Sequence, residues 1–105
     1  MSNNKTTVKE LVHYTVKAEH LQEYSTVVLP ELRTFLSSQS GFIAHECLLA
    51  NTNDGHLVDI VVWEDMDSAK ASAAEWQRRT KAGDFSNMIA AIDKVEFFDH
   101  LTPIS

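Results

Sequence analysis

The chain has 105 residues, of which 44% are hydrophobic and 23% are charged, and its net charge is −6 at pH 7. This length allows one domain, over residues 1–105, with one core. The acidic balance excludes a polyphosphate-binding surface, so we expect no nucleic-acid partner. No apolar run is long enough to span a bilayer, and residues 1–5 lead into a strand instead of a signal peptide, so we expect a cytoplasmic protein without a membrane partner.

The first third of the chain predicts a strand followed by a helix. Residues 8–16 are rich in β-branched and aromatic side chains, which is typical of a strand. From about residue 20 to residue 38 the apolar residues follow the spacing of one helical face. Pro30 lies inside this segment and predicts a kink or the start of a new helical segment.

The middle of the chain predicts a β-hairpin. Residues 42–50 and 57–63 have the character of strands, and the Asn51-Thr52-Asn53-Asp54-Gly55 run between them is typical of a turn. The second of these strands, Leu-Val-Asp-Ile-Val-Val-Trp, is apolar on both faces, and Asp59 is its only polar residue.

The last third predicts a helix, a short helix and a strand. Asp65 or Asp67 can cap a helix over residues 67–80, and Gly83 suits its end. Asp84 can cap a short helix, and residues 94–101 resemble a strand. The order β-α-β-β-α-β with right-handed crossovers predicts an α+β, ferredoxin-like fold, with a four-stranded antiparallel sheet in the order 4-1-3-2 and both helices on one face.

The third predicted strand also indicates a homodimer. Val58, Ile60 and Val62 lie on one of its faces, and Leu57, Val61 and Trp63 lie on the other. Apolar residues on both faces of a strand indicate that both faces of the sheet are covered. Because the helices cover only one face, a second copy of the chain is the simplest cover, and two sheets packed in this way close an α+β barrel.

Two segments resemble the dimeric α+β barrel superfamily, and within it the antibiotic biosynthesis monooxygenase-like domains most closely. They are Gly41-Phe42-Ile43-Ala44-His45-Glu46, and Val61-Val62-Trp63-Glu64-Asp65 running into the next helix. The stress-responsive α/β barrel proteins are a close second. The resemblance covers about residues 8–101. It implies a pocket between sheet and helices in each subunit, and dimerisation through the other sheet face.

Cofactor-free monooxygenases of this family place a polar residue and a Trp in that pocket, four residues apart on the third strand. Asp59 and Trp63 match this spacing, with Asp in place of the usual amide. The haem-degrading branch instead uses a His on the second helix as the axial ligand of the iron. That helix has no histidine here, so we expect no haem degradation.

The candidate catalytic residues are one carboxylate and two histidines. Asp59 in an apolar strand is suited to act as a general base, with a structural carboxylate as the alternative. His13 and His100 lie on the strands expected to neighbour it, and they could meet Asp59 if their faces agree. If the faces differ, these polar residues line the dimer barrel. The trio matches no metal-ligand spacing, so we expect no metal.

The candidate substrate-binding residues are mostly aromatic: Trp63, Tyr14, Trp76 and His45. If the odd-numbered face of the third strand looks at the helices, Trp76 and the short helix over residues 85–92 should close a pocket over Asp59 and Trp63. If that face looks into the dimer barrel, Asp59 should meet a His and serve structure. Cys47, the only cysteine, excludes an internal disulfide and is expected to pack as a small hydrophobe.

The residues leave two hypotheses for the function. In the first, the chain binds a small aromatic or hydroxylated metabolite and catalyses its oxygenation or isomerisation without a cofactor. In the second, it is a non-catalytic, stress-related dimer that binds a ligand or serves structure. The sequence contains no nucleotide, flavin or hydrolase motif. An enclosed cavity reached by Asp59 or a histidine favours the first hypothesis, and a filled core favours the second.

Overall fold

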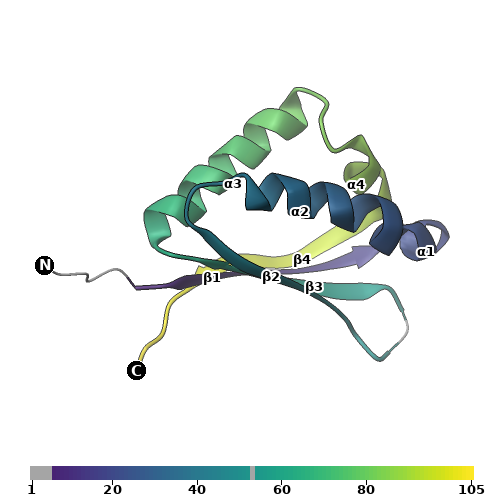
Figure 1. The fold of residues 1–105 in the computed structure, drawn as a ribbon. Coiled ribbons are helices and arrows are strands. Elements are labelled where there is room, and N and C mark those ends of the chain that lie inside the picture. The colour runs from purple at the N-terminus through teal and green to yellow at the C-terminus, as the bar shows by residue number, and fades with distance from the viewer. Residues whose placement is uncertain (1–5, 53) are drawn as a thin grey trace, which may run out of the picture.

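The computed structural model describes residues 6–52 and 54–105, which form a layer of helices on one face of a four-stranded sheet (Figure 1). The strand order is β2-β3-β1-β4, and each neighbouring pair is antiparallel. The predicted ferredoxin-like α+β fold is therefore confirmed. The elements in chain order are β1 (Val8–Val16), η1 (Ala18–His20), α1 (Leu21–Glu23), η2 (Tyr24–Val28), α2 (Leu29–Ser37), β2 (Phe42–Leu49), β3 (His56–Trp63), α3 (Met66–Lys81), α4 (Ser86–Ala91) and β4 (Ile92–Leu101).

The first helical segment is broken where the sequence predicts it. Pro30 stands in the first turn of α2, and the preceding η2 is a widened π-helical turn. Proline has no N–H to donate and its ring presses on the preceding turn, which is a common cause of such irregularities. Tyr24, Val28, Leu32 and Phe35 are all buried, as the periodic spacing predicts.

The ends of α3 agree with the sequence, whereas the start of α4 does not. The Asp65 side chain accepts a hydrogen bond of 2.8 Å from the N–H of Ser68 and caps α3, and Gly83 follows its end with a φ of 97°. The prediction that Asp84 caps the short helix is wrong. Phe85 holds that position with a φ of 61°, and it makes no side-chain cap. Asp84 instead belongs to the turn that ends α3, and its backbone N–H donates a hydrogen bond to the carbonyl of Arg79.

The core lies between the helices and one face of the sheet. On β3 the odd-numbered residues Leu57, Asp59, Val61 and Trp63 are all buried under the helices, while the even-numbered residues are half-buried. On β1 the even-numbered residues face the same way, because Tyr14 pairs with Leu57 and Val12 with Asp59. The odd-numbered face of the third strand thus looks at the helices, which is the first of the two predicted arrangements.

The opposite face of the sheet has no helix among the described residues (Figure 1). Its apolar residues, among them Val58, Ile60 and Val62, share the face with polar ones such as Glu46 and Asp99. Leu48 is 45% exposed and Phe97 is 47% exposed, and both lie on this face by their pairing with the half-buried Val58 and with His13, respectively.

Candidate functional site

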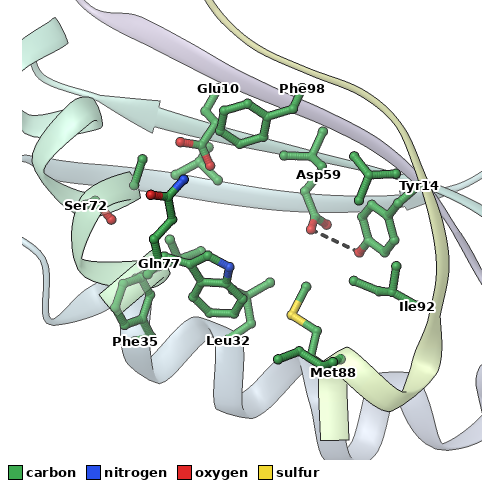
Figure 2. A pocket seen from close by; sticks show the side chains of 17 residues that line it. Glu10, Tyr14, Leu32, Phe35, Asp59, Ser72, Gln77, Met88, Ile92 and Phe98 are labelled. Atoms are coloured by element: carbon green, nitrogen blue, oxygen red, sulfur yellow. Dashed lines mark hydrogen bonds between the residues drawn. The ribbon is translucent and has the colours of Figure 1, made fainter. Parts of the chain in front are cut away.

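A cavity of about 390 Å³ lies between the sheet and the helices α2, α3 and α4. Most of its wall is apolar. Three large aromatic side chains contribute to it: Phe35, Trp76 and Phe98. The polar residues that reach the wall are Glu10, Tyr14, Asp59, Ser72 and Gln77. Figure 2 shows Asp59 and Tyr14 together on one side, with Glu10 and Gln77 on the other. A few polar groups on a concave apolar wall are typical of a small-molecule site.

Asp59 is the most deeply buried charged residue of this wall, with 4% of its surface exposed. Its Oδ2 accepts a hydrogen bond of 3.0 Å from the Tyr14 hydroxyl (Figure 2). Its Oδ1 has no hydrogen-bond partner among the described residues, and it lies 3.4 Å from Nε2 of His45. A buried carboxylate with one unpartnered oxygen is costly to the fold, so it is a sign of function.

His45 lies behind Asp59 and not on the cavity wall. It comes from β2, and its side chain is only 2% exposed. Nε of Arg33 donates to Nδ1 of His45 at 3.4 Å. A ring nitrogen that accepts has no proton, so we assign the proton of His45 to Nε2, the nitrogen that lies 3.4 Å from Oδ1 of Asp59.

The second tyrosine extends the network away from the cavity. The hydroxyls of Tyr14 and Tyr24 are 2.6 Å apart. Since Tyr14 donates its proton to Asp59, Tyr24 donates to Tyr14. Burial, followed by the charge of Asp59, raises the pKa of the Tyr14 phenol far above its ordinary value of 10.0, and burial raises that of Tyr24 as well. Both phenols therefore stay protonated and act as donors.

The thiol of Cys47 lies at the edge of the same network, directly opposite Asp59 in the pairing of β2 with β3. Its Sγ is 3.9 Å from the Tyr14 hydroxyl. Burial, followed by the charge of Asp59, raises the pKa of Cys47 to about 12. A protonated, half-buried thiol is unreactive, which agrees with the predicted packing role.

A second ionisable pair lies across neighbouring strands at the cavity wall. Nε2 of His100 on β4 is 3.0 Å from Oε1 of Glu10 on β1, and each side chain is 13% exposed. Burial raises the pKa of the Glu10 carboxyl, and the bond and charge of His100 offset part of this rise. Glu10 lines the cavity, and His100 is not among the lining residues.

Three aromatic rings hold the helices over the cavity. Trp76 of α3 stacks on Phe85 with the ring centroids 4.3 Å apart, and Phe35 of α2 meets both rings edge-on at 5.3 and 5.4 Å. Such pairs stabilise by about 0.5–1.5 kcal/mol each beyond their burial. They fix α2, α3 and the start of α4 relative to one another.

The structure brings Asp59, Tyr14 and Trp76 to one cavity, but Trp63 is not at its wall. Trp63 shares the face of Asp59, as its spacing predicts, yet it is fully buried and packs edge-on against Phe42 at 5.9 Å. The expectation that Trp63 lines the cavity is therefore wrong. About 13 Å separate residues four apart on a strand, which takes Trp63 beyond the end of the cavity.

The predicted meeting of His13 and His100 with Asp59 does not occur. His13 is odd-numbered on β1 and lies on the opposite face of the sheet, where its Nε2 is 2.7 Å from Nδ1 of His56. His100 lies on the helix side but bonds Glu10. The substrate-binding position expected for His45 is also wrong, since His45 supports Asp59 from outside the cavity.

The lining residues that sequence reasoning missed include Glu10, Ser72, Gln77 and Phe98. Glu10 could have been found from its parity, because it lies two and four residues from Val12 and Tyr14 on one strand face. Phe98 could not, because register shifts in the pairing of β1 with β4 change which residues of β4 face the helices.

No group of three or more His, Cys, Asp or Glu side chains in residues 6–52 and 54–105 is arranged to hold a metal ion. Within the same residues, no helix is both long and apolar enough to cross a membrane.

The family model for antibiotic biosynthesis monooxygenases matches residues 7–90. The chain belongs to this family. Its fold is similar to that of SnoaB, a cofactor-independent oxygenase from Streptomyces nogalater, with a TM-score of 0.75 and 22% identity over 95% of both chains. A candidate antibiotic biosynthesis monooxygenase from Bordetella bronchiseptica gives a TM-score of 0.75 at 10% identity, covering 96% of this chain and all of that one.

A conserved protein from Methanosarcina mazei has the same fold, with a TM-score of 0.67 and 15% identity over 93% of this chain and 91% of that one. No protein of curated function matches the sequence. The family match favours the monooxygenase-like branch of the predicted resemblance over the stress-responsive one. At these identities the solved structures establish the fold alone.

Proposed function

We propose that this member of the antibiotic biosynthesis monooxygenase family is a cofactor-independent monooxygenase, with Asp59 as the general base. The observation that carries the proposal is the buried carboxylate of Asp59, whose Oδ1 is unpartnered among the described residues, on an apolar cavity of about 390 Å³. A cavity of this volume suits a ligand of two or three fused rings. The family membership supports the reaction class.

The reaction needs a substrate with an acidic C–H group, such as a methylene carbon activated by a neighbouring carbonyl and phenol. Asp59 takes the proton, and the electron pair left on carbon reduces O₂ to a carbon-bound hydroperoxide. The hydroperoxide then eliminates water, and the carbon becomes a carbonyl. One oxygen atom of O₂ enters the product and the other leaves as water, so the electrons balance without an external reductant.

Tyr14 and His45 position the base. Tyr14 donates to Oδ2 at 3.0 Å, and Nε2 of His45 lies 3.4 Å from Oδ1 without a hydrogen bond, so Oδ1 remains able to accept a substrate proton. Arg33, which is exposed on α2, fixes the ring of His45 from outside. A base that is held before the substrate arrives loses little entropy on reaction.

The aromatic wall gives the substrate a surface for stacking. Trp76 and Phe35 come from the helices and Phe98 comes from β4, so a planar ligand is enclosed from two sides. Asp59 is only 4% exposed, so the wall around it limits contact with bulk water, which would otherwise protonate the carbanion.

We also propose that the chain works as a homodimer, with the helix-free face of the sheet as its interface. The exposed Leu48 and Phe97 and the half-buried Ile60 support this, because apolar side chains that no helix covers favour contact with a partner. A cytoplasmic location remains a prediction from the sequence.

Oxygen uptake with a panel of anthrones and hydroxynaphthalenes tests the enzymatic proposal. We expect one O₂ to be consumed per product. With ¹⁸O₂, one labelled atom should appear in the product and the other in water. Asp59→Asn should lose this activity. Product formed at an undiminished rate without O₂ would identify an isomerase instead. No turnover and no ligand binding across the panel would contradict the proposal and favour a structural dimer.

A further inference from the structure

The charges on the cavity wall are all of one sign. Among the described residues that line it, two are carboxylates, Glu10 and Asp59, and none is Lys, Arg or His. The other polar members, Tyr14, Ser72 and Gln77, are uncharged. A ligand in this cavity therefore meets hydrogen-bond acceptors that carry negative charge and no fixed cation.

Glu10 and Asp59 are diagonal neighbours on the sheet. Val12 pairs directly with Asp59, and Glu10 is two residues before Val12 on the same face of β1. Diagonal neighbours lie about 7–8 Å apart, roughly the width of one to two fused rings. The two carboxylates can thus contact two different groups of one planar ligand, and Figure 2 shows both beside the same space.

Glu10 can still accept a hydrogen bond from a ligand while it is paired with His100. His100 contacts Oε1 at 3.0 Å. Trp63 also favours the carboxylate form of Glu10 and lowers its pKa. A carboxylate has about four acceptor sites, so these two neighbours leave capacity for a ligand. Ser72, which is 4% exposed, and Gln77 border the same part of the cavity in Figure 2. The cavity therefore has a second polar region, formed by side chains of β1 and α3 and separate from the base Asp59.

From this arrangement we infer that Glu10, held by His100, determines the specificity of the cavity by accepting a hydrogen bond from a hydroxyl of a neutral substrate and by excluding ligands that carry a carboxylate there. The inference rests on the proposed function and narrows its substrate class to neutral aromatics with hydroxyl groups at two places. Glu10 is a binding residue in this account and takes no proton from carbon.

The cavity disfavours an anionic ligand whether His100 is neutral or protonated. If His100 is neutral, an anionic ligand meets two carboxylates. If His100 is protonated, its charge offsets Glu10, but the ligand still meets Asp59 and finds no cation on the wall. Like charges placed together in a site weaken binding, whereas a hydroxyl that donates to a carboxylate strengthens it.

Three naphthalenes of one shape test the inference by calorimetric titration at pH 7.5: 2,6-dihydroxynaphthalene, 2-naphthol and 6-hydroxy-2-naphthoic acid. We expect the diol to bind more tightly than the acid by at least about tenfold, which corresponds to about 1.4 kcal/mol. We expect 2-naphthol to fall between them, because it lacks the second donor but carries no charge. Equal affinity of the wild-type protein for diol and acid would overturn the inference.

Two variants then assign the discrimination to this place in the cavity. Glu10→Gln keeps an acceptor and removes the charge, so the ratio of the two dissociation constants should shrink by about tenfold, mainly through tighter binding of the acid. Gln77→Lys adds a cation at an exposed lining position and should improve binding of the acid without disturbing the core. A ratio that stays unchanged in both variants would contradict the role of Glu10.

The outcomes separate the two proposals. If the naphthols bind without discrimination of charge, the inference about Glu10 fails and the proposed monooxygenase stands. If none of the three probes binds to the folded wild-type protein, both the aromatic cavity site and the inference fail. Melting curves of Glu10→Gln and Gln77→Lys show whether each variant is folded before its titration is interpreted.

Discussion

Tyr14 and Asp59 meet across two neighbouring strands, with the hydroxyl of Tyr14 on β1 donating to Oδ2 of Asp59 on β3 at 3.0 Å. Tyr14 is 1% exposed and Asp59 is 4% exposed, so water does not compete for this bond. A polar contact of this kind, between groups that line a cavity, couples the stability of the sheet to the chemistry of the site. The effects of substitutions on turnover and on folding can therefore be separated residue by residue.

Replacement of the base tests the chemistry most directly. We expect Asp59→Asn to lower kcat by about 100- to 10,000-fold, because general base catalysis contributes a factor of this size. Dissociation constants for the naphthols should change little, and the melting temperature should hold or rise, because a buried charge has been removed. Asp93→Asn, on an exposed position of β4, is the matched control and should keep wild-type kcat. A large loss of stability in Asp59→Asn with retained turnover would mark Asp59 as structural.

The two tyrosines differ in how closely they act on Asp59. Tyr14→Phe removes the donor to Oδ2, and we expect a loss of about 1–3 kcal/mol in the free energy of unfolding together with a lower kcat, because a buried acceptor loses its partner. Tyr24→Phe removes only the outer hydroxyl and leaves the bond from Tyr14 to Asp59 in place. Urea denaturation and initial rates for both variants give the comparison. If Tyr24→Phe lowers kcat as much as Tyr14→Phe, the assigned direction of the chain of hydrogen bonds is wrong.

High pH should unfold the protein cooperatively. In the folded state the pKa of Cys47 is raised from 9.0 to about 12, and those of Tyr14 and Tyr24 are raised from 10.0. An acid whose folded pKa is raised stabilises the fold below its unfolded pKa, and this contribution is lost as pH rises toward the folded pKa. The free energy of unfolding should therefore fall from about pH 9, with a slope that approaches about 4 kcal/mol per pH unit above pH 10 when three protons are released.

Tyrosinate absorbance checks this prediction without interference, because Tyr14 and Tyr24 are the only tyrosines of the chain. The absorbance should appear together with loss of the helical circular dichroism signal. Cys47→Ala should flatten the slope most near pH 9, where the unfolded thiol, with its ordinary pKa of 9.0, contributes more than the two phenols. Tyrosinate that forms at pH 10 in a fully folded protein would contradict the burial of the phenols.

Two glycines with positive φ should respond differently to alanine. A Cβ on Gly41 would lie 2.2 Å from Oγ and 2.5 Å from Cβ of Ser68, whereas a Cβ on Gly83 would meet nothing within 4 Å. Gly83→Ala should lower the free energy of unfolding by about 1–2 kcal/mol, the cost of a left-handed backbone for a residue with a Cβ. Gly41→Ala should lose about 1–3 kcal/mol more, because the start of α3 must move. Thermal and urea denaturation of the pair measure the difference, and equal losses would show that Ser68 can move aside.

The proposed dimer can be weakened without harm to the subunit. Phe97→Lys puts a charge on the helix-free face of the sheet, at a position 47% exposed, so we expect dissociation from about twice the chain mass of 11.8 kDa to the monomer at micromolar concentration. Val27→Lys, on the helical side with 42% exposure, is the control and should leave the mass unchanged. Size-exclusion chromatography with light scattering measures the mass of each variant. A wild-type protein that is monomeric under these conditions would refute the dimer.

The sequence by itself determined which residues of each strand share a face. Asp59 and Trp63 lie on one face of β3, and the apolar character of both faces was readable from alternation with period two. The break at Pro30, the cap by Asp65 and the order of the strands followed from local chemistry and from the handedness of crossovers.

Only the tertiary structure decided which face meets the helices, and so which residues meet Asp59. Period two assigns residues to faces but does not say which face is inside when both are apolar. The pairing of whole strands then sets the faces: His13 pairs with Val58 and faces away from the helices, whereas His45 pairs with Val61 and His100 with Glu10 on the helix side. The cavity itself is the space left where side chains of α2, α3 and the sheet do not fill the gap between layers, a property of packing that no single strand or helix carries.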